Sequence, residues 1–128
     1  MPLQVTKSPH PVAATADRLI AALEGRGITV FARIDHAGGA RAAGLEVPDE
    51  ELLVFGDPRA GTPLMQDDPQ VGYELPLRLL VWEAGGETLV GYRPLTELAE
   101  RYAIGARSEL LARMTKLLEG LVAEASAP

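Results

Sequence analysis

The residues best suited to chemistry gather in two short stretches of the chain. His36 follows Asp35 at the end of an apolar run, and the stretch FGDPRAGTPLMQ, residues 55–66, holds Asp57 and Arg59 among glycines and prolines. An imidazole titrates at about pH 6.5 and so can act as an acid or a base. No serine or cysteine nucleophile motif accompanies His36, and adjacent residues of a strand point to opposite faces, so Asp35 need not orient it. The sequence therefore favours a capping Asp35 and a hydrogen-bonded His36 over a catalytic pair.

The glycines of residues 56–62 raise the possibility of an anion-binding loop. Arg59 would add positive charge to such a loop, but the lysine of a phosphate-binding GxxxxGK[ST] motif is missing, and Asp57 would repel an anion. Turn chemistry explains the same residues more simply. Asp57-Pro58 is a turn signal, Gly61 tolerates a positive φ, and Thr62 can cap a helix that starts at Pro63. Asp68-Pro69 repeats this pattern, so residues 56–76 are expected to be an ordered excursion.

Composition excludes several classes of function. The net charge is −6, and the ten arginines and two lysines are spread along the chain, which argues against nucleic-acid binding. Thiolate catalysis and zinc–cysteine sites are excluded because there is no cysteine. No set of metal ligands converges in the sequence, and Asp67-Asp68 fits helix capping better than a cation site. We expect no cofactor, no metal, no signal sequence and no membrane span, and hence a cytoplasmic protein.

Periodicity and turn residues predict the elements that must position these side chains. Apolar and β-branched runs predict strands. Apolar residues at i, i+3, i+4 and i+7 predict the long helices, and Gly85-Gly86 predicts a hairpin between the last two strands. The predicted strands are 3–7, 28–34, 51–55, 77–83 and 87–92. The predicted helices are 12–25, a short one at 36–43, one opened by Pro94, and a leucine-rich one at about 106–123.

These elements predict an α+β fold in a single domain over residues 1–128. Short links between successive strands favour an antiparallel sheet of about five strands with helices packed on one face. The leucine-rich helix must cover the sheet or meet a second copy of itself, because such a stripe does not stay in water. His10 is expected to be a solvated loop residue. Five of the aromatic residues are expected in the core or on a sheet face, where some could line an apolar pocket; they are Phe31, Tyr73, Trp82, Tyr92 and Tyr102.

Four separated stretches resemble one known family. They read FARIDHAGGARAAGL, LLVFGDPRAGTPLMQDDP, LPLRLLVWEAGGETLVGYRP and LAERYAI, and together they cover about residues 12–104 in order. They are similar to the domain of unknown function 302 family. The resemblance implies a TBP-like α+β fold in the order β-α-β-β-β-β-α, often as a homodimer, and it brings no settled activity, substrate or catalytic residue. Asp57 stands where the family typically has Asn, which keeps the turn chemistry but adds a charge.

The sequence leaves three functions open. The favoured one is a non-catalytic module, acting as a homodimer, that binds a small molecule between the sheet and residues 56–73. The expected polar contacts are His36, Asp57, Arg59 and Thr62, and the expected apolar contacts are Leu64 and Met65, which would serve as a lid. The second is a protein-interaction or structural module that uses the sheet edge or the last helix. The third and weakest is an enzyme with His36 as general base.

Overall fold

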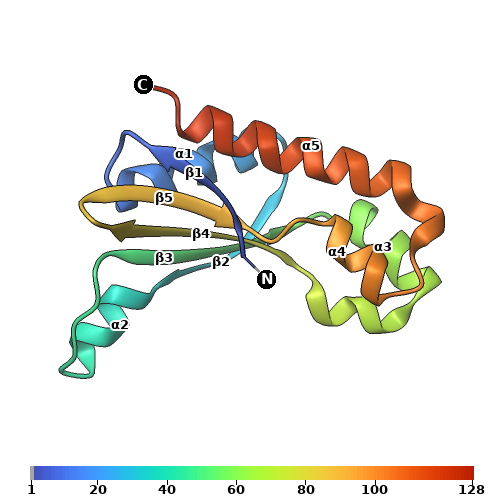
Figure 1. Cartoon of the computed structure of the whole chain (residues 1–128), viewed down its shortest axis with the longest axis horizontal. Helices are drawn as coiled ribbons and strands as arrows, with labels where there is room; N and C mark the ends of the chain where they lie inside the picture. Colours follow the sequence, from blue (N-terminus) through green and yellow to red (C-terminus); the bar gives the residue numbers. More distant parts are fainter. Residues whose placement is uncertain (1) are drawn as a thin grey trace.

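The computed structural model describes residues 2–128 and contains a five-stranded sheet (Figure 1). The strand order is β1-β5-β4-β3-β2, and every neighbouring pair is antiparallel. This confirms the predicted α+β class and the five antiparallel strands. The strands are β1 (Gln4–Ser8), β2 (Thr29–Asp35), β3 (Glu50–Gly56), β4 (Leu77–Ala84) and β5 (Glu87–Tyr92).

Seven helical segments connect or follow the strands, counted over residues 2–128. The α-helices are α1 (Val12–Gly25), α2 (His36–Ala42), α3 (Pro58–Asp67), α4 (Thr96–Arg101) and α5 (Ser108–Ala125). The 3₁₀ turns are η1 (Pro69–Glu74) and η2 (Gly105–Arg107). The two long helices, α1 and α5, lie side by side over one face of the sheet, while α2 projects beyond the sheet end (Figure 1).

Alternation along the strands shows which face of the sheet meets these helices. On β3, Leu53 and Phe55 are buried, whereas Leu52 and Val54, which alternate with them, are only half-buried. Because successive strand residues point to opposite faces, the buried set faces α1 and α5.

The hairpin turn follows the expected chemistry, since Gly85 and Gly86 both have positive φ, at 59° and 79°.

The leucine-rich helix is an internal packing element. Six residues of α5 are buried, and they face α1 and the sheet: Leu111, Met114, Leu118, Leu121, Val122 and Ala125. Of the two predicted outcomes for this stripe, packing within the chain is the one found. The end of α5 is tied down as well, because Arg18 donates from Nε to the carbonyl of Ala125 at 2.9 Å. His10 Nε2 lies 2.6 Å from the carbonyl oxygen of Ala127, so the prediction of a solvated His10 is wrong.

A buried carboxylate joins β2 and β3 to α1. Glu51 is 8% exposed, and its Oε1 accepts a hydrogen bond from Arg33 Nε at 2.5 Å. The same guanidinium donates to Asp17 on α1 at 2.6 Å. These two carboxylates raise the pKa of Arg33, with the hydrogen bond to Glu51 the larger cause. Arg33 therefore stays charged and compensates Glu51.

Candidate functional site

The excursion after β3 begins as a helix at Pro58, five residues before the predicted helix start at Pro63. Asp57 is the N-cap of α3, its carboxylate accepts from the amide of Arg59 at 3.0 Å, and Pro58 occupies the first turn. The helix then runs through Gly61, Thr62 and Pro63, so the predicted positive φ at Gly61 and the predicted cap at Thr62 are wrong. An interior proline removes a helical hydrogen bond, and for this reason the prediction puts the helix start at Pro63.

The second cap lies where the sequence predicts it. Asp68 is extended, and its Oδ1 accepts from the amide of Gln70 at 3.1 Å to start η1. Its other oxygen accepts from the amide of Ala103 at 3.0 Å. Arg107, the last residue of η2, donates from Nε to Asp67 Oδ2 at 3.0 Å. The excursion is therefore fastened to the segment that leads into α5, and it is an ordered structure as predicted.

An apolar pocket of about 280 Å³ lies beside α3; we call it the α3 pocket. Its walls come from the ends of β2 and β3, from α3 and η1, and from one side of α5. The apolar lining residues include Ile28, Phe31, Phe55, Ala60, Met65, Leu75, Leu77, Met114 and Leu117. A site of this kind favours ligands with little polar surface.

A β-bulge brings one aromatic ring to this pocket. The register between β2 and β3 shifts between Val30 and Ala32, and Phe31 is the extra residue. A bulge re-aims its side chain, and Phe31 Cε2 lies 3.4 Å from the position that a Cβ on Gly56 would take. Phe31 stays 55% exposed. It is therefore a pocket wall that solvent still reaches: of the places expected for the aromatic residues, Phe31 takes the apolar pocket and not the core.

At the edge of the pocket, Asp57 and Arg59 form an ion pair with each other. Arg59 Nε donates to both carboxylate oxygens of Asp57, at 3.1 and 3.2 Å. These hydrogen bonds, first from the Arg59 side chain and then from its amide, lower the pKa of Asp57 below its ordinary value. Asp57 thus remains an anion that is already paired, and the pocket itself presents mainly apolar surface.

The six residues predicted to contact a ligand do not all lie at one site. Asp57, Thr62 and Met65 line the α3 pocket. Arg59 is outside the lining and pairs with Asp57. Leu64 is fully buried in the core, so it is no lid.

His36 lies at the opposite end of the sheet from the pocket. It follows Asp35, which pairs with Glu51 at one end of β3, whereas Gly56 at the pocket pairs with Thr29. His36 is exposed as the first residue of α2, and Asp35 caps that helix by accepting from the amide of Gly38 at 2.8 Å. The structure therefore separates His36 from the other predicted contacts.

Sequence reasoning missed the residues that give the pocket its apolar character. Met114 and Leu117 belong to α5, roughly fifty positions after α3, and were assigned only to a packing stripe. Leu75 and Ile28 sit at element boundaries, where periodicity is weakest. Tyr73 was expected to be in the core or on a sheet face, yet it is 89% exposed on η1.

Residues 2–128 contain neither a cluster of metal ligands nor a membrane-spanning helix. Among residues 2–128, no three His, Asp or Glu side chains come together in a way that would hold a metal ion. No helix in that range has the length and apolar character needed to cross a bilayer.

The fold and pocket define an α+β domain in which two long helices cover one face of an antiparallel sheet and an apolar pocket opens beside a capped excursion. The chain belongs to the family described as domain of unknown function DUF302, whose model matches residues 4–121. A solved structure of an uncharacterized conserved DUF302 protein from Bacillus stearothermophilus has the same fold. It matches with a TM-score of 0.86 at 22% identity, over 96% of this chain and 97% of that one.

Curated relatives carry the same segment in longer chains. The fluoride-specific ion channel FluC 1 of Brucella suis biovar 1 is 41% identical over 109 residues, which is 84% of this chain and 43% of that protein. FluC 2 of Brucella melitensis biotype 1 matches at the same identity over 40% of its length. The chain thus spans about two fifths of the length of the curated relatives it matches.

Proposed function

We propose that this protein is a non-catalytic module that binds a small molecule in the α3 pocket and acts as a homodimer. The observation that carries the proposal is the pocket itself, with its volume of about 280 Å³ and its apolar walls. The ordered excursion supports it, because two capped turns and the Asp67–Arg107 pair hold one wall in place. Pre-formed apolar clefts with few polar groups are the usual form of small-molecule sites.

The pocket favours a neutral ligand of one or two rings, or an alkyl chain of similar bulk. An apolar cavity of about 150 Å³ is sufficient for benzene, and the α3 pocket is larger. Asp57 is the charged group in the lining, and Arg59 already pairs with it. A ligand with its own charge would gain no free partner there.

Binding of 1-fluoronaphthalene, followed by ¹⁹F NMR, tests this proposal. We expect saturable line broadening with the natural sequence and its loss in Gly61→Leu, because Gly61 lines the pocket. Gly39→Leu is the matched control, since Gly39 lies on α2 with open space around it. If Gly61→Leu unfolds, Leu117→Trp fills the pocket from α5. Equal binding by a folded pocket variant and by the control would refute the proposal.

The proposed homodimer rests on where apolar residues are exposed. Of the seven large apolar residues that are exposed among residues 2–128, four fall between positions 31 and 47: Phe31, Ile34, Leu45 and Val47. Phe31 and Ile34 belong to the edge strand β2, and Leu45 and Val47 belong to the loop after α2, in the part that projects beyond the sheet (Figure 1). Exposed apolar groups along a sheet edge and on the loop that adjoins it favour pairing with another chain.

Light scattering on the purified protein tests the dimer. We expect a mass of twice the 13.6 kDa of the chain, and a single-chain mass for Leu45→Glu. Tyr73→Glu is the control, because Tyr73 is also exposed but lies on η1. A single-chain mass for the natural sequence at micromolar concentration would refute dimerisation.

A second candidate, a protein-interaction module, is favoured by the curated relatives. In the Brucella proteins the matched segment accounts for 40–43% of a chain named as a fluoride-specific ion channel. The segment could therefore act by contacting the rest of such a chain. A binding assay between two purified pieces of the Brucella suis relative, the matched segment and the remainder, tests this. Failure of the pieces to associate would remove this candidate and leave the small-molecule proposal untouched.

A further inference from the structure

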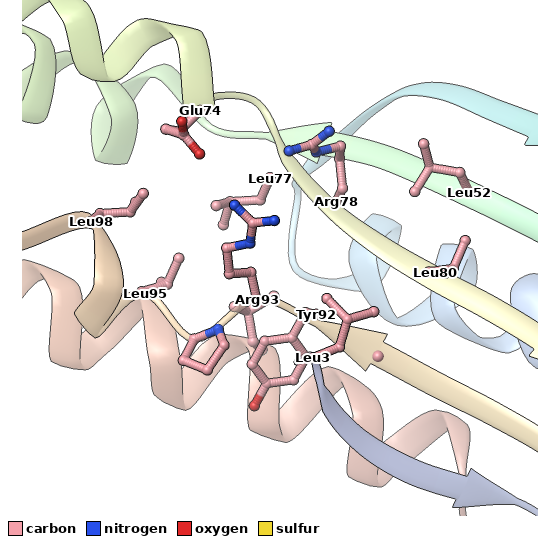
Figure 2. Close-up of a pocket in the computed structure, with 13 residues that line it drawn as sticks. Leu3, Leu52, Glu74, Leu77, Arg78, Leu80, Tyr92, Arg93, Leu95 and Leu98 are labelled. Atoms are coloured by element: carbon pink, nitrogen blue, oxygen red, sulfur yellow. The ribbon is translucent and has the colours of Figure 1, made fainter. Parts of the chain in front are cut away.

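A second pocket, of about 220 Å³, combines apolar walls with arginine side chains (Figure 2). We call it the arginine pocket. It lies where β4 and β5 meet the segment that leads into α4, and Leu77 lines both this pocket and the α3 pocket. Its apolar lining includes Leu3, Leu52, Leu80, Tyr92, Pro94, Leu95 and Leu98.

Arg78 and Arg93 supply the positive charge. In Figure 2, Arg93 extends from the end of β5 toward Leu77, and the guanidinium of Arg78 turns toward the side of the pocket where Glu74 lies. Among the ion pairs and side-chain hydrogen bonds within residues 2–128, none involves Arg78. Arg78 is exposed, so its guanidinium can donate to an anionic ligand that also contacts the apolar wall.

Arg93 is only weakly compensated. Its Nε lies 3.9 Å from Glu97 Oε2, whereas Arg101 approaches the same oxygen to 3.3 Å. Glu97 is 7% exposed and is thus shared between two arginines, with Arg101 the closer. Much of the charge of Arg93 therefore remains available to a ligand.

Glu74 is the acidic residue in the lining, and it already has a partner. The hydroxyl of Tyr102 donates to Glu74 Oε2 at 2.8 Å. This hydrogen bond raises the pKa of Tyr102, so the phenol stays a donor at neutral pH. Two arginines against one occupied carboxylate leave the pocket with net positive character.

We propose that the arginine pocket binds the carboxylate of a small amphipathic acid, with Arg78 and Arg93 holding the carboxylate and the leucine-rich walls holding the apolar part. Guanidinium groups match the two oxygens of a carboxylate in a planar, bidentate arrangement. The adjoining walls, formed by residues such as Leu77, Leu80 and Leu95, suit an aromatic ring or a short alkyl chain. The site is separate from the neutral-ligand site proposed above and does not depend on it.

Titration with 4-(trifluoromethyl)benzoate, followed by ¹⁹F NMR, tests the proposal. The neutral comparison is 4-(trifluoromethyl)benzamide, which keeps the ring but lacks the charge. We expect the benzoate to bind at least about tenfold more tightly than the benzamide, as a charge-assisted pair implies. Arg78→Gln and Arg93→Gln should each weaken benzoate binding about tenfold. Added salt should also weaken it.

Arg113→Gln on the exposed side of α5 is the charge-matched control and should leave benzoate binding unchanged. Binding of 1-fluoronaphthalene should be the same in Arg78→Gln as in the natural sequence, so failure at one pocket is distinguishable from failure at the other. Inorganic phosphate tests whether the anion alone is sufficient; complete competition by phosphate at equal concentration would contradict a site for an amphipathic acid. Equal affinities for the benzoate and the benzamide would overturn the proposal, as would equal losses in the arginine variants and in Arg113→Gln.

Discussion

Replacing Gly61 by alanine should stabilise the protein while narrowing the α3 pocket. Gly61 is helical and half-buried in α3, and a Cβ built on it lies 3.4 Å from Leu75 Cδ1 and 4.0 Å from Met65 Cε. These are ordinary van der Waals distances, so no neighbour must move. Glycine in a helix interior costs about 1 kcal/mol relative to alanine.

The buried methyl group adds to this gain. A fully buried CH₂ contributes about 0.8 kcal/mol, and half of that is reasonable for a methyl group facing an open pocket. We therefore expect Gly61→Ala to raise the free energy of unfolding by about 1–1.5 kcal/mol. Gly39→Ala on α2, where the added Cβ meets nothing within 4 Å, should gain at most the helix-propensity part, about 1 kcal/mol.

Urea denaturation followed by circular dichroism measures both variants. With a slope of about 2 kcal/mol/M, the urea midpoint for Gly61→Ala should rise by about 0.5–0.75 M. The same variant should bind 1-fluoronaphthalene more weakly, because the methyl group projects beside the pocket wall, whereas Gly39→Ala should not. If Gly61→Ala instead lowers the free energy of unfolding by more than about 0.5 kcal/mol, then Gly61 is not helical or has no room for a methyl group beside it.

Three further perturbations test the packing and the charges. Arg33→Met leaves Glu51 buried without its partner and should lower the free energy of unfolding by about 2–3 kcal/mol, a value reduced because Arg33 is one-third exposed. Adding Glu51→Leu should recover most of this loss. Urea midpoints that show no recovery would contradict the pairing. Leu121→Ala on α5 should cost about 2–5 kcal/mol by the same assay, because Leu121 is fully buried, and a change below 1 kcal/mol would mean that α5 does not pack as described. Because the folded protein lowers the pKa of Asp57, its carboxylate contributes stability above the ordinary value of about 3.9, and this contribution is lost as the pH falls through the lower folded value. Arg59→Gln should move that pKa upward in a ¹³C NMR titration of the carboxyl group, and an unchanged titration would contradict the assigned cause.

Most of the fold follows from local patterns. The strand containing Leu53 and Phe55 alternates buried and half-buried residues, and Gly85-Gly86 supplies the positive φ values that a two-residue hairpin needs. These signals lie within a few residues of each other. The predicted last helix also holds, because its leucines repeat at helical spacing.

The site was less predictable because its parts are distant in sequence. Asp57 and Met65 lie at the pocket, but Leu117 reaches it from α5, and no local pattern indicates that contact. The bulge at Phe31 leaves no sequence signal either, since a β-branched run reads the same with or without an extra residue. The start of α3 was predicted wrongly at Pro63, because proline is more frequent in the first turn of a helix than in its interior.

A crystal structure of the protein grown with 1-bromonaphthalene, with data collected at the bromine absorption edge, would show whether the α3 pocket binds an apolar ligand. We expect one strong anomalous peak in the α3 pocket, between Gly61 on α3 and Leu117 on α5. An α3 pocket without an anomalous peak, in crystals that hold the compound elsewhere on the molecule, would contradict it.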